Sequence, residues 1–209
     1  MRLLIFLLLA MFQLPLFAQK AAVDANVVLD NVLAGLKADA PVRMDYIYKV
    51  YDDDNELLQG DRGIIYVDNG RYALLMQDMK VWCDGTTQWS YMREVNEVYI
   101  TDADSEEAQN FSPLYIVEHY RSVCELSAAS KGGLVAVNLQ AKGDDNGVGS
   151  IELLVSGDDN RLVSMTMYMP GQGRIDVELD GYVADCGADS ALFACPLDEF
   201  STAEVVDMR

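Results

Sequence analysis

Residues that could support covalent catalysis are few in this sequence. His119 is the single histidine, so it would have to serve every imidazole role, and Cys124 follows it five residues later as a candidate nucleophile. A cysteine–histidine pair works when a third group orients the base, and the intervening segment supplies none. The sequence also lacks a Gly-x-Ser-x-Gly elbow and a phosphate-binding glycine loop. We therefore interpret His119 as an ordinary helix-face histidine and expect no catalytic residues.

The four cysteines, Cys83, Cys124, Cys186 and Cys195, are an even number, which in an exported protein permits three fully paired connectivities. Cys186 and Cys195 are close in sequence and near predicted strand ends, whereas the other two lie within predicted strands. We therefore predict a Cys186–Cys195 disulfide. Zinc is the alternative use of these thiols, but there is no Cys-x-x-Cys pair and His119 is not at ligand spacing from a cysteine.

Carboxylate-rich stretches at 52–54, 102–107 and 144–146 raise the question of calcium. An EF-hand loop needs a glycine at position 6 together with a glutamate at position 12, and no stretch has both. Solvated turns and acidic loops explain these segments without a metal. We expect neither a metal site nor a cofactor.

Apolar residues that alternate along predicted strands are more informative. Val163, Met165, Met167 and Met169 point to one side of a strand, and Ile175, Val177 and Leu179 repeat the pattern on the next. Together with Met44, Tyr46, Tyr48, Tyr72, Leu74 and Met76 they form a face rich in methionine and tyrosine. Because methionine adapts its shape to irregular partners, such a face suits a pocket for flexible acyl chains. The alternative is an ordinary core beneath the N-terminal helix, and the pattern taken alone favours this second interpretation.

The elements that would position this face follow from hydrophobic periodicity. Helical spacing over residues 24–37, with Asp24 as a possible cap, predicts one amphipathic helix, and Pro113 after Ser112 predicts the start of a second one. Period-two segments separated by turn residues predict strands at 42–50, 57–67, 71–77, 80–84, 87–92, 97–101, 123–129, 134–141, 150–155, 162–169 and 174–183. The expected architecture is a single α+β domain, residues 19–209, built on one large antiparallel sheet.

Composition and the N-terminus limit the functional classes. The 209 residues include 15 Lys and Arg against 34 Asp and Glu, a net charge of −19, which excludes nucleic-acid binding and disfavours anionic bilayers. Arg2 followed by an apolar stretch, with Ala18 before Gln19, predicts a signal peptide over residues 1–18. Because no later segment is long enough to span a bilayer and the residue directly after the cleavage site, Gln19, is not a cysteine, we expect a soluble exported protein without a lipid anchor.

A family resemblance emerges from motifs taken in order. The run Gln59-Gly60-Asp61-Arg62-Gly63-Ile64-Ile65-Tyr66-Val67, then Arg71-Tyr72, then Cys83-Asp84-Gly85-Thr86-Thr87-Gln88-Trp89-Ser90-Tyr91 resembles the outer-membrane lipoprotein carrier family, LolA type. The ending, from Leu192-Phe193-Ala194-Cys195-Pro196 through Val205-Val206-Asp207-Met208-Arg209, is also similar to the family's closing segment.

The resemblance implies an incomplete antiparallel β-barrel, a strongly curved sheet whose open side is covered by short helices. In the family the enclosed apolar cavity carries the acyl chains of lipoproteins across the periplasm, from an inner-membrane lipoprotein-releasing complex to the outer membrane. A periplasmic, monomeric carrier without enzymatic activity, cofactor or stable membrane anchoring is therefore expected. Two alternatives stay open: a related periplasmic carrier or chaperone for another lipid or an apolar peptide, and an enzyme that uses His119 or Cys124.

The predicted ligand-binding residues combine the alternating apolar face with the aromatic residues of the family hairpin. They are Met44, Tyr46, Tyr48, Tyr72, Leu74, Met76, Trp89, Tyr91, Val163, Met165, Met167, Met169, Ile175, Val177 and Leu179.

Overall fold

The computed structural model of the chain describes residues 23–109, 113–143 and 147–209. The predicted signal peptide and its cleavage site, the Ser112 cap and the 144–146 stretch lie outside these residues. Within the described ranges, no helix combines the length and the apolar character needed to cross a membrane.

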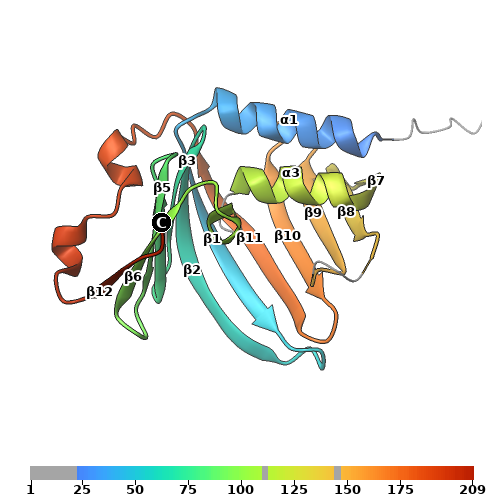
Figure 1. Cartoon of the computed structure of the whole chain (residues 1–209). Helices are drawn as coiled ribbons and strands as arrows, with labels where there is room; N and C mark the ends of the chain where they lie inside the picture. Colours follow the sequence, from blue (N-terminus) through green and yellow to red (C-terminus); the bar gives the residue numbers. More distant parts are fainter. Residues whose placement is uncertain (1–22, 110–112, 144–146) are drawn as a thin grey trace, which may run out of the picture.

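Most of the molecule is one large, open, curved sheet (Figure 1). Its twelve strands lie in the order β12-β6-β5-β4-β3-β2-β1-β11-β10-β9-β8-β7, and every pair is antiparallel except β12 with β6. The strands are β1 (Val42–Tyr51), β2 (Leu57–Asp68), β3 (Arg71–Leu75), β4 (Met79–Cys83), β5 (Thr87–Met92), β6 (Glu97–Asp102), β7 (Cys124–Lys131), β8 (Leu134–Ala141), β9 (Ser150–Ser156), β10 (Leu162–Met169), β11 (Gly173–Val183) and β12 (Glu204–Asp207). The predicted α+β fold with an incomplete barrel is confirmed, since the two edge strands, β12 and β7, do not pair with each other.

Two helices cover one face of the sheet (Figure 1). Helix α1 (Ala25–Ala38) starts as predicted at Asp24, whose carboxylate accepts a hydrogen bond of 2.9 Å from the backbone N–H of Asn26. Helix α3 (Pro113–Val123) includes Val123, which was predicted to be the first residue of the following strand. Apolar side chains of both helices pack against the inward residues of β8, β9 and β10, which forms the largest part of the core.

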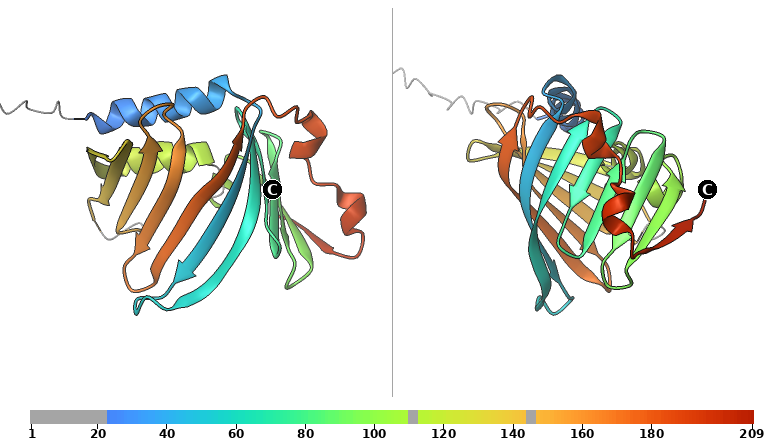
Figure 2. Two further views of the ribbon diagram at one scale, coloured as in Figure 1. Left: turned by 180° about the vertical axis from the view of Figure 1, so that it is seen from behind. Right: turned by 90° about the vertical axis from the view of Figure 1, so that its left-hand side faces the viewer.

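The C-terminal segment covers the opposite face, next to the strands at the other end of the sheet (Figure 2). It contains the short helices η1 (Ser190–Phe193) and η2 (Leu197–Phe200) before β12. Phe193 is fully buried against Trp82, and the ring of Phe200 lies 5.5 Å from that of Trp82. A four-residue helix, α2 (Glu106–Gln109), follows β6 within the acidic stretch. The sheet therefore has apolar cores on both faces.

The predicted Cys186–Cys195 disulfide is wrong, because all four cysteines are free thiols in this structure. Cys195 packs into the cluster around Trp82 and Phe193. The backbone N–H of Cys186 instead donates to the carbonyl of Pro41, 2.9 Å away, at the junction between α1 and β1. Nearness in sequence did not bring the two thiols together, because the segment between them contains η1 and leads from the α1–β1 junction to the cluster around Trp82.

Candidate functional site

A cavity of about 380 Å³ lies between α3 and the middle of the sheet. It is lined by Met44, Tyr46, Tyr48, Val50, Ile65, Leu74, Met76, Val117, Leu153, Leu162, Met165, Ile175, Val177 and Leu179. None of these side chains is charged, and the two tyrosine hydroxyls are their only polar groups. We call this space the central cavity.

Strand register explains why residues far apart in sequence meet here. In β1 and β11, Tyr48 is paired with Val177. In β10, Met165 is paired with the same Val177 on one side and with Leu153 of β9 on the other. Since paired residues share a face and side chains alternate along each strand, one face of four neighbouring strands becomes continuously apolar.

The structure gathers most of the predicted ligand-binding residues in this cavity. Those that line it are Met44, Tyr46, Tyr48, Leu74, Met76, Met165, Ile175, Val177 and Leu179. The remaining ones lie elsewhere, for three different reasons.

Trp89 and Tyr91 point to the other face of the sheet. In β5 the residues on the cavity face are Gln88 and Ser90, so Trp89 and Tyr91, which alternate with them, pack toward the C-terminal segment. The ring of Tyr91 lies 4.4 Å from that of Phe200. The hairpin aromatics thus hold the C-terminal segment and do not contact the cavity.

Tyr72 is on the cavity face but in a separate, polar part of it. It is buried, and its hydroxyl donates to the side-chain oxygen of Gln88 and approaches the carbonyl of Ala108 at 3.1 Å. Burial raises the pKa of Tyr72 above its ordinary value, so this phenol stays neutral. Tyr72 fastens α2 to the sheet.

Strand β10 departs from simple alternation at its start. A bulge between Leu162 and Ser164 places Leu162, and not the predicted Val163, in the cavity lining. Met167 and Met169 keep the inward phase, but they pack into the core beneath the helices. These two methionines are therefore core residues, as the alternative interpretation of the pattern expects, and they do not line the cavity.

Sequence reasoning missed Val50, Ile65, Val117, Leu153 and Leu162. Val50, Ile65 and Leu153 continue the period-two pattern of predicted strands, so that signal could have found them. Val117 comes from α3, and only the packing of that helix over the sheet brings it to the cavity.

Tyr46 carries the most confined polar group of the lining. Its side chain is 7% exposed, and its hydroxyl has no hydrogen-bond partner within the described part of the chain. The ring crosses β2 directly over Gly63, where a Cβ atom would lie 2.3 Å from the hydroxyl oxygen. Burial raises the pKa of Tyr46, so the phenol adds no charge to the cavity.

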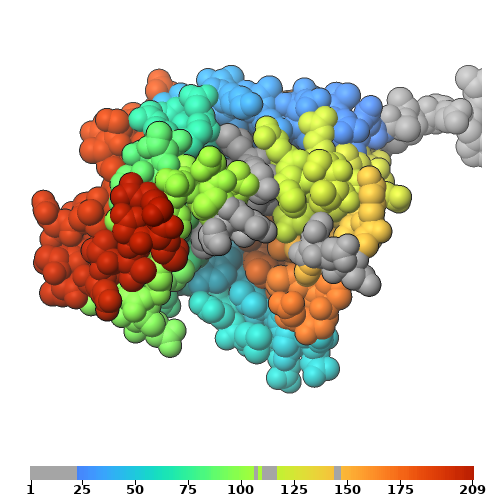
Figure 3. Space-filling model, in the orientation of Figure 1, coloured from blue at the N-terminus to red at the C-terminus, as the bar shows by residue number. Residues whose placement is uncertain are grey.

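Polar contacts tie the two covering helices together. The Arg121 guanidinium of α3 donates to Asp30 at 2.5 Å and to Asn26 at 3.0 Å, both on α1. The hydrogen bond from Arg121 holds the pKa of Asp30 below its usual range. At the other end of α1, Asp39 accepts a hydrogen bond of 2.9 Å from Tyr182 of β11. Figure 3 shows α1 and α3 side by side above the projecting β1–β2 hairpin.

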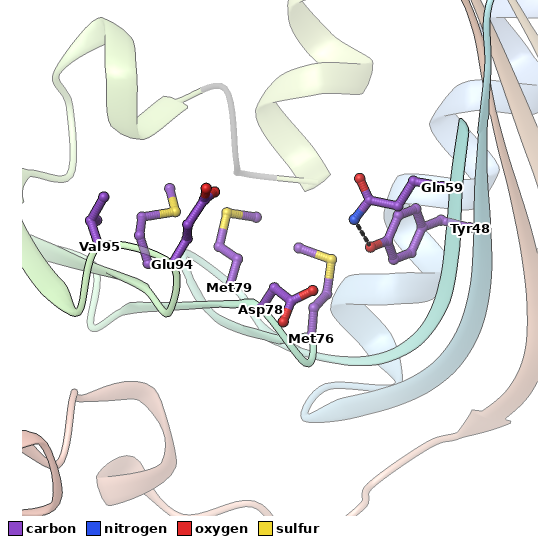
Figure 4. A pocket seen from close by; sticks show the side chains of 8 residues that line it. Tyr48, Gln59, Met76, Asp78, Met79, Glu94 and Val95 are labelled. Atoms are coloured by element: carbon purple, nitrogen blue, oxygen red, sulfur yellow. Dashed lines mark hydrogen bonds between the residues drawn. The ribbon is translucent and has the colours of Figure 1, made fainter. Parts of the chain in front are cut away.

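A second pocket of about 430 Å³ adjoins the central cavity. Tyr48 and Met76 line both spaces. The other lining residues are Gln59, Asp78, Met79, Met92, Glu94 and Val95. Figure 4 shows Met76, Asp78, Met79 and Glu94 extending to one side of the ribbon, with Tyr48 and Gln59 facing them, joined by a hydrogen bond of 3.0 Å. We call this space the methionine pocket.

His119 and Cys124, the residues considered for catalysis, lie in α3 and at the start of β7. The ring of His119 lies 5.2 Å from that of Tyr120, and Cys124 is buried in the core below the helices. Burial raises the pKa of the Cys124 thiol, whereas a nucleophilic cysteine needs a lowered one. Among the described residues, no three His, Cys, Asp or Glu side chains gather where they could hold a metal ion.

Comparison with solved structures shows that this fold occurs in other proteins. A search of curated proteins finds no match. An uncharacterized conserved protein from Thermus thermophilus shares the fold, with a TM-score of 0.53 and 13% identity over 88% of this chain and 98% of that chain. A LolA superfamily protein from Nitrosomonas europaea has a TM-score of 0.43 and 9% identity, covering 84% and 100% of the two chains. For the MucA/MucB complex of Pseudomonas aeruginosa the TM-score is 0.44 and the identity 12%, over 83% and 62%. At these identities the likeness concerns the fold alone.

The family itself is identified at the level of sequence. A family model described as outer membrane lipoprotein carrier protein LolA matches residues 55–171, which is more than half of the chain. The matched segment runs from β2 to the end of β10 and so includes most of the strands that line the central cavity. The chain therefore belongs to the LolA family of outer membrane lipoprotein carrier proteins.

Proposed function

We propose that this protein is a periplasmic carrier that holds the acyl chains of lipoproteins in its central cavity and moves them from the inner to the outer membrane. The observation that carries the proposal is the lining of the cavity, which presents apolar side chains, two tyrosine hydroxyls and no Asp, Glu, Lys, Arg or His. A flexible hydrocarbon chain is the ligand that gains most from such a lining.

The size of the cavity suits one acyl chain. If a methylene needs about the volume of a water molecule, roughly 30 Å³, the cavity of about 380 Å³ has room for about a dozen methylenes. Transfer of each methylene from water contributes about 0.8 kcal/mol. Even partial filling therefore supplies several kcal/mol relative to exposure of the acyl chain to water, enough to keep an acylated protein soluble during transit.

We assign no catalytic activity to the protein, because the residues of the central cavity do not include catalytic groups. The cavity lining contains no nucleophile or titrating acid–base pair, and Cys124 is a buried thiol with a raised pKa.

The predicted signal peptide supports export, and family membership supports loading from an inner-membrane lipoprotein-releasing complex. No cofactor is required.

The test is a loading and transfer experiment with the purified protein. An acylated lipoprotein should form a soluble complex with it in the absence of detergent and should then pass to acceptor vesicles. The matched control is the same lipoprotein with serine in place of its acylated cysteine, which should not bind. Equal binding of the control would show a carrier of apolar peptides, and co-purification of free lipid without lipoprotein binding would show a carrier of another lipid.

A further inference from the structure

Resting on the proposed function, we propose that the methionine pocket receives the first residues of the acylated polypeptide and prefers a positively charged side chain there. The pocket adjoins the space assigned to the acyl chain, because Tyr48 and Met76 form part of both linings. A cargo whose acyl chain leaves the central cavity between these residues enters the methionine pocket next. The acylated residue of the cargo, which is joined to the acyl chain, would therefore lie in the methionine pocket.

Three methionine side chains of the pocket, which we call its floor, can adapt to ligands of different shape. Met79 of β4 and Met92 of β5 are directly paired across the sheet, and the backbone N–H of Met76 donates to the carbonyl of Met79 at 2.9 Å. Three thioether side chains thus line one pocket at the end of two hairpins. Because methionine fits partners of different shape, this floor can accept the varied sequences that follow the acylated residue in different cargo proteins.

The two charged residues that line the methionine pocket, Asp78 and Glu94, are both acidic. Asp78 and Glu94 are both exposed, and neither carboxylate forms an ion pair or a side-chain hydrogen bond within the part of the chain that the structure describes. The two turns that carry them are held together, since the backbone N–H of Arg93 donates to the carbonyl of Asp78 at 2.9 Å. The Arg93 side chain does not belong to the lining. A lysine or arginine of the cargo would gain from both carboxylates, and an acidic residue would be repelled.

The occupant we infer is a polypeptide and not a membrane surface. The net charge of −19 repels the anionic headgroups of a bilayer. A single cationic side chain attached to a bound acyl chain avoids that cost, and the acyl chain holds it beside the carboxylates at high effective concentration. The pocket therefore determines which acylated polypeptides bind best.

The experiment uses three N-palmitoylated peptides that differ only in the residue after the acylated one, which is lysine, glutamine or glutamate. Their affinities are measured by displacement of a fluorescent fatty acid from the purified protein, at low and at high salt. We expect the lysine peptide to bind about tenfold more tightly than the glutamate peptide at low salt. The difference should shrink at high salt, because the carboxylates are exposed.

The variant Asp78→Asn/Glu94→Gln should lose this preference and bind the glutamine peptide as the parent does. The control Glu125→Gln/Asp158→Asn makes the same change in net charge at two exposed carboxylates outside the pocket, and it should keep the preference. Equal affinity of the parent for the lysine and glutamate peptides would overturn the inference while leaving the carrier function intact. Failure of all three peptides to displace the probe would instead contradict the carrier function. Lysophospholipids with headgroups of different charge are measured in the same displacement assay. A charge preference shown by them and not by the peptides would assign the pocket to a lipid headgroup and overturn the peptide assignment.

Discussion

Replacing Met165 with glutamate tests whether the central cavity must stay uncharged. Met165 lines the cavity between Val177 and Leu153, which are its cross-strand neighbours and also line it. In the empty protein, water can solvate a carboxylate at this position. Once an acyl chain fills the space, the carboxylate has no cation among the lining residues and must either take up a proton or keep water in the cavity.

The cost follows from the ordinary pKa of a glutamate. Protonating a side chain with a pKa near 4.3 requires about 3.7 kcal/mol at pH 7 and about 1 kcal/mol at pH 5. The first value is the largest penalty to expect, since retained water lowers it. We therefore expect Met165→Glu to weaken binding of an acylated ligand by between about tenfold and a few hundredfold at pH 7. Much of this loss should be recovered at pH 5.

The assay is titration with a fluorescent fatty acid or a palmitoylated peptide at both pH values, with circular dichroism to show that the variant is folded. The matched control is Tyr168→Glu, three residues along the same strand, whose side chain is 48% exposed and outside the cavity. It should bind like the parent at both pH values. A folded Met165→Glu variant with parental affinity at pH 7 would refute the assignment of the cavity as the acyl site.

Three further predictions concern the supporting structure. Gly63→Ala places a Cβ 2.3 Å from the ring and hydroxyl of Tyr46, so we expect a loss of about 1–3 kcal/mol in urea unfolding; parental stability would contradict this packing. Arg121→Gln removes the hydrogen bond that lowers the folded-state pKa of Asp30. A carboxyl group with a lowered folded-state pKa stabilises the fold above its unfolded pKa near 3.9, and this benefit disappears as pH falls. The gap in Tm between parent and variant should therefore narrow toward pH 2, where the hydrogen bond from Arg121 to Asn26 still distinguishes them, and a gap that does not change with pH argues against the Asp30 contact. Burial raises the pKa of the Cys83 thiol, so alkylation followed by mass spectrometry should be slow in the folded protein and fast in denaturant; rapid native labelling would be inconsistent with its burial.

Local patterns predicted much of this fold. Asp24 and the helical period after it located α1, and the alternation in β1, β10 and β11 located strands that line the cavity. These predictions succeeded because each depends on side chains within one element, where spacing determines which face is apolar.

Features that depend on distant packing could not be predicted in the same way. Trp89 was expected in the cavity because a sequence does not reveal that the C-terminal segment buries the other face of the sheet, where Trp89 packs. The bulge that exchanges Val163 for Leu162 depends on how β10 pairs with β9, and Val117 reaches the cavity only through the placement of α3. The parallel pairing of β12 with β6 likewise has no local signal.

The central claim is that an acyl chain occupies the central cavity, and photo-crosslinking tests it most directly. A palmitoylated peptide with a diazirine near the end of its acyl chain is bound to the purified protein, irradiated, and the labelled residues are identified by mass spectrometry. The account predicts labels on the cavity lining, including Met165 and Val177, that are lost on competition with unlabelled ligand. Saturable labelling of Trp89 and Phe200 on the opposite face, with none in the cavity, would contradict it.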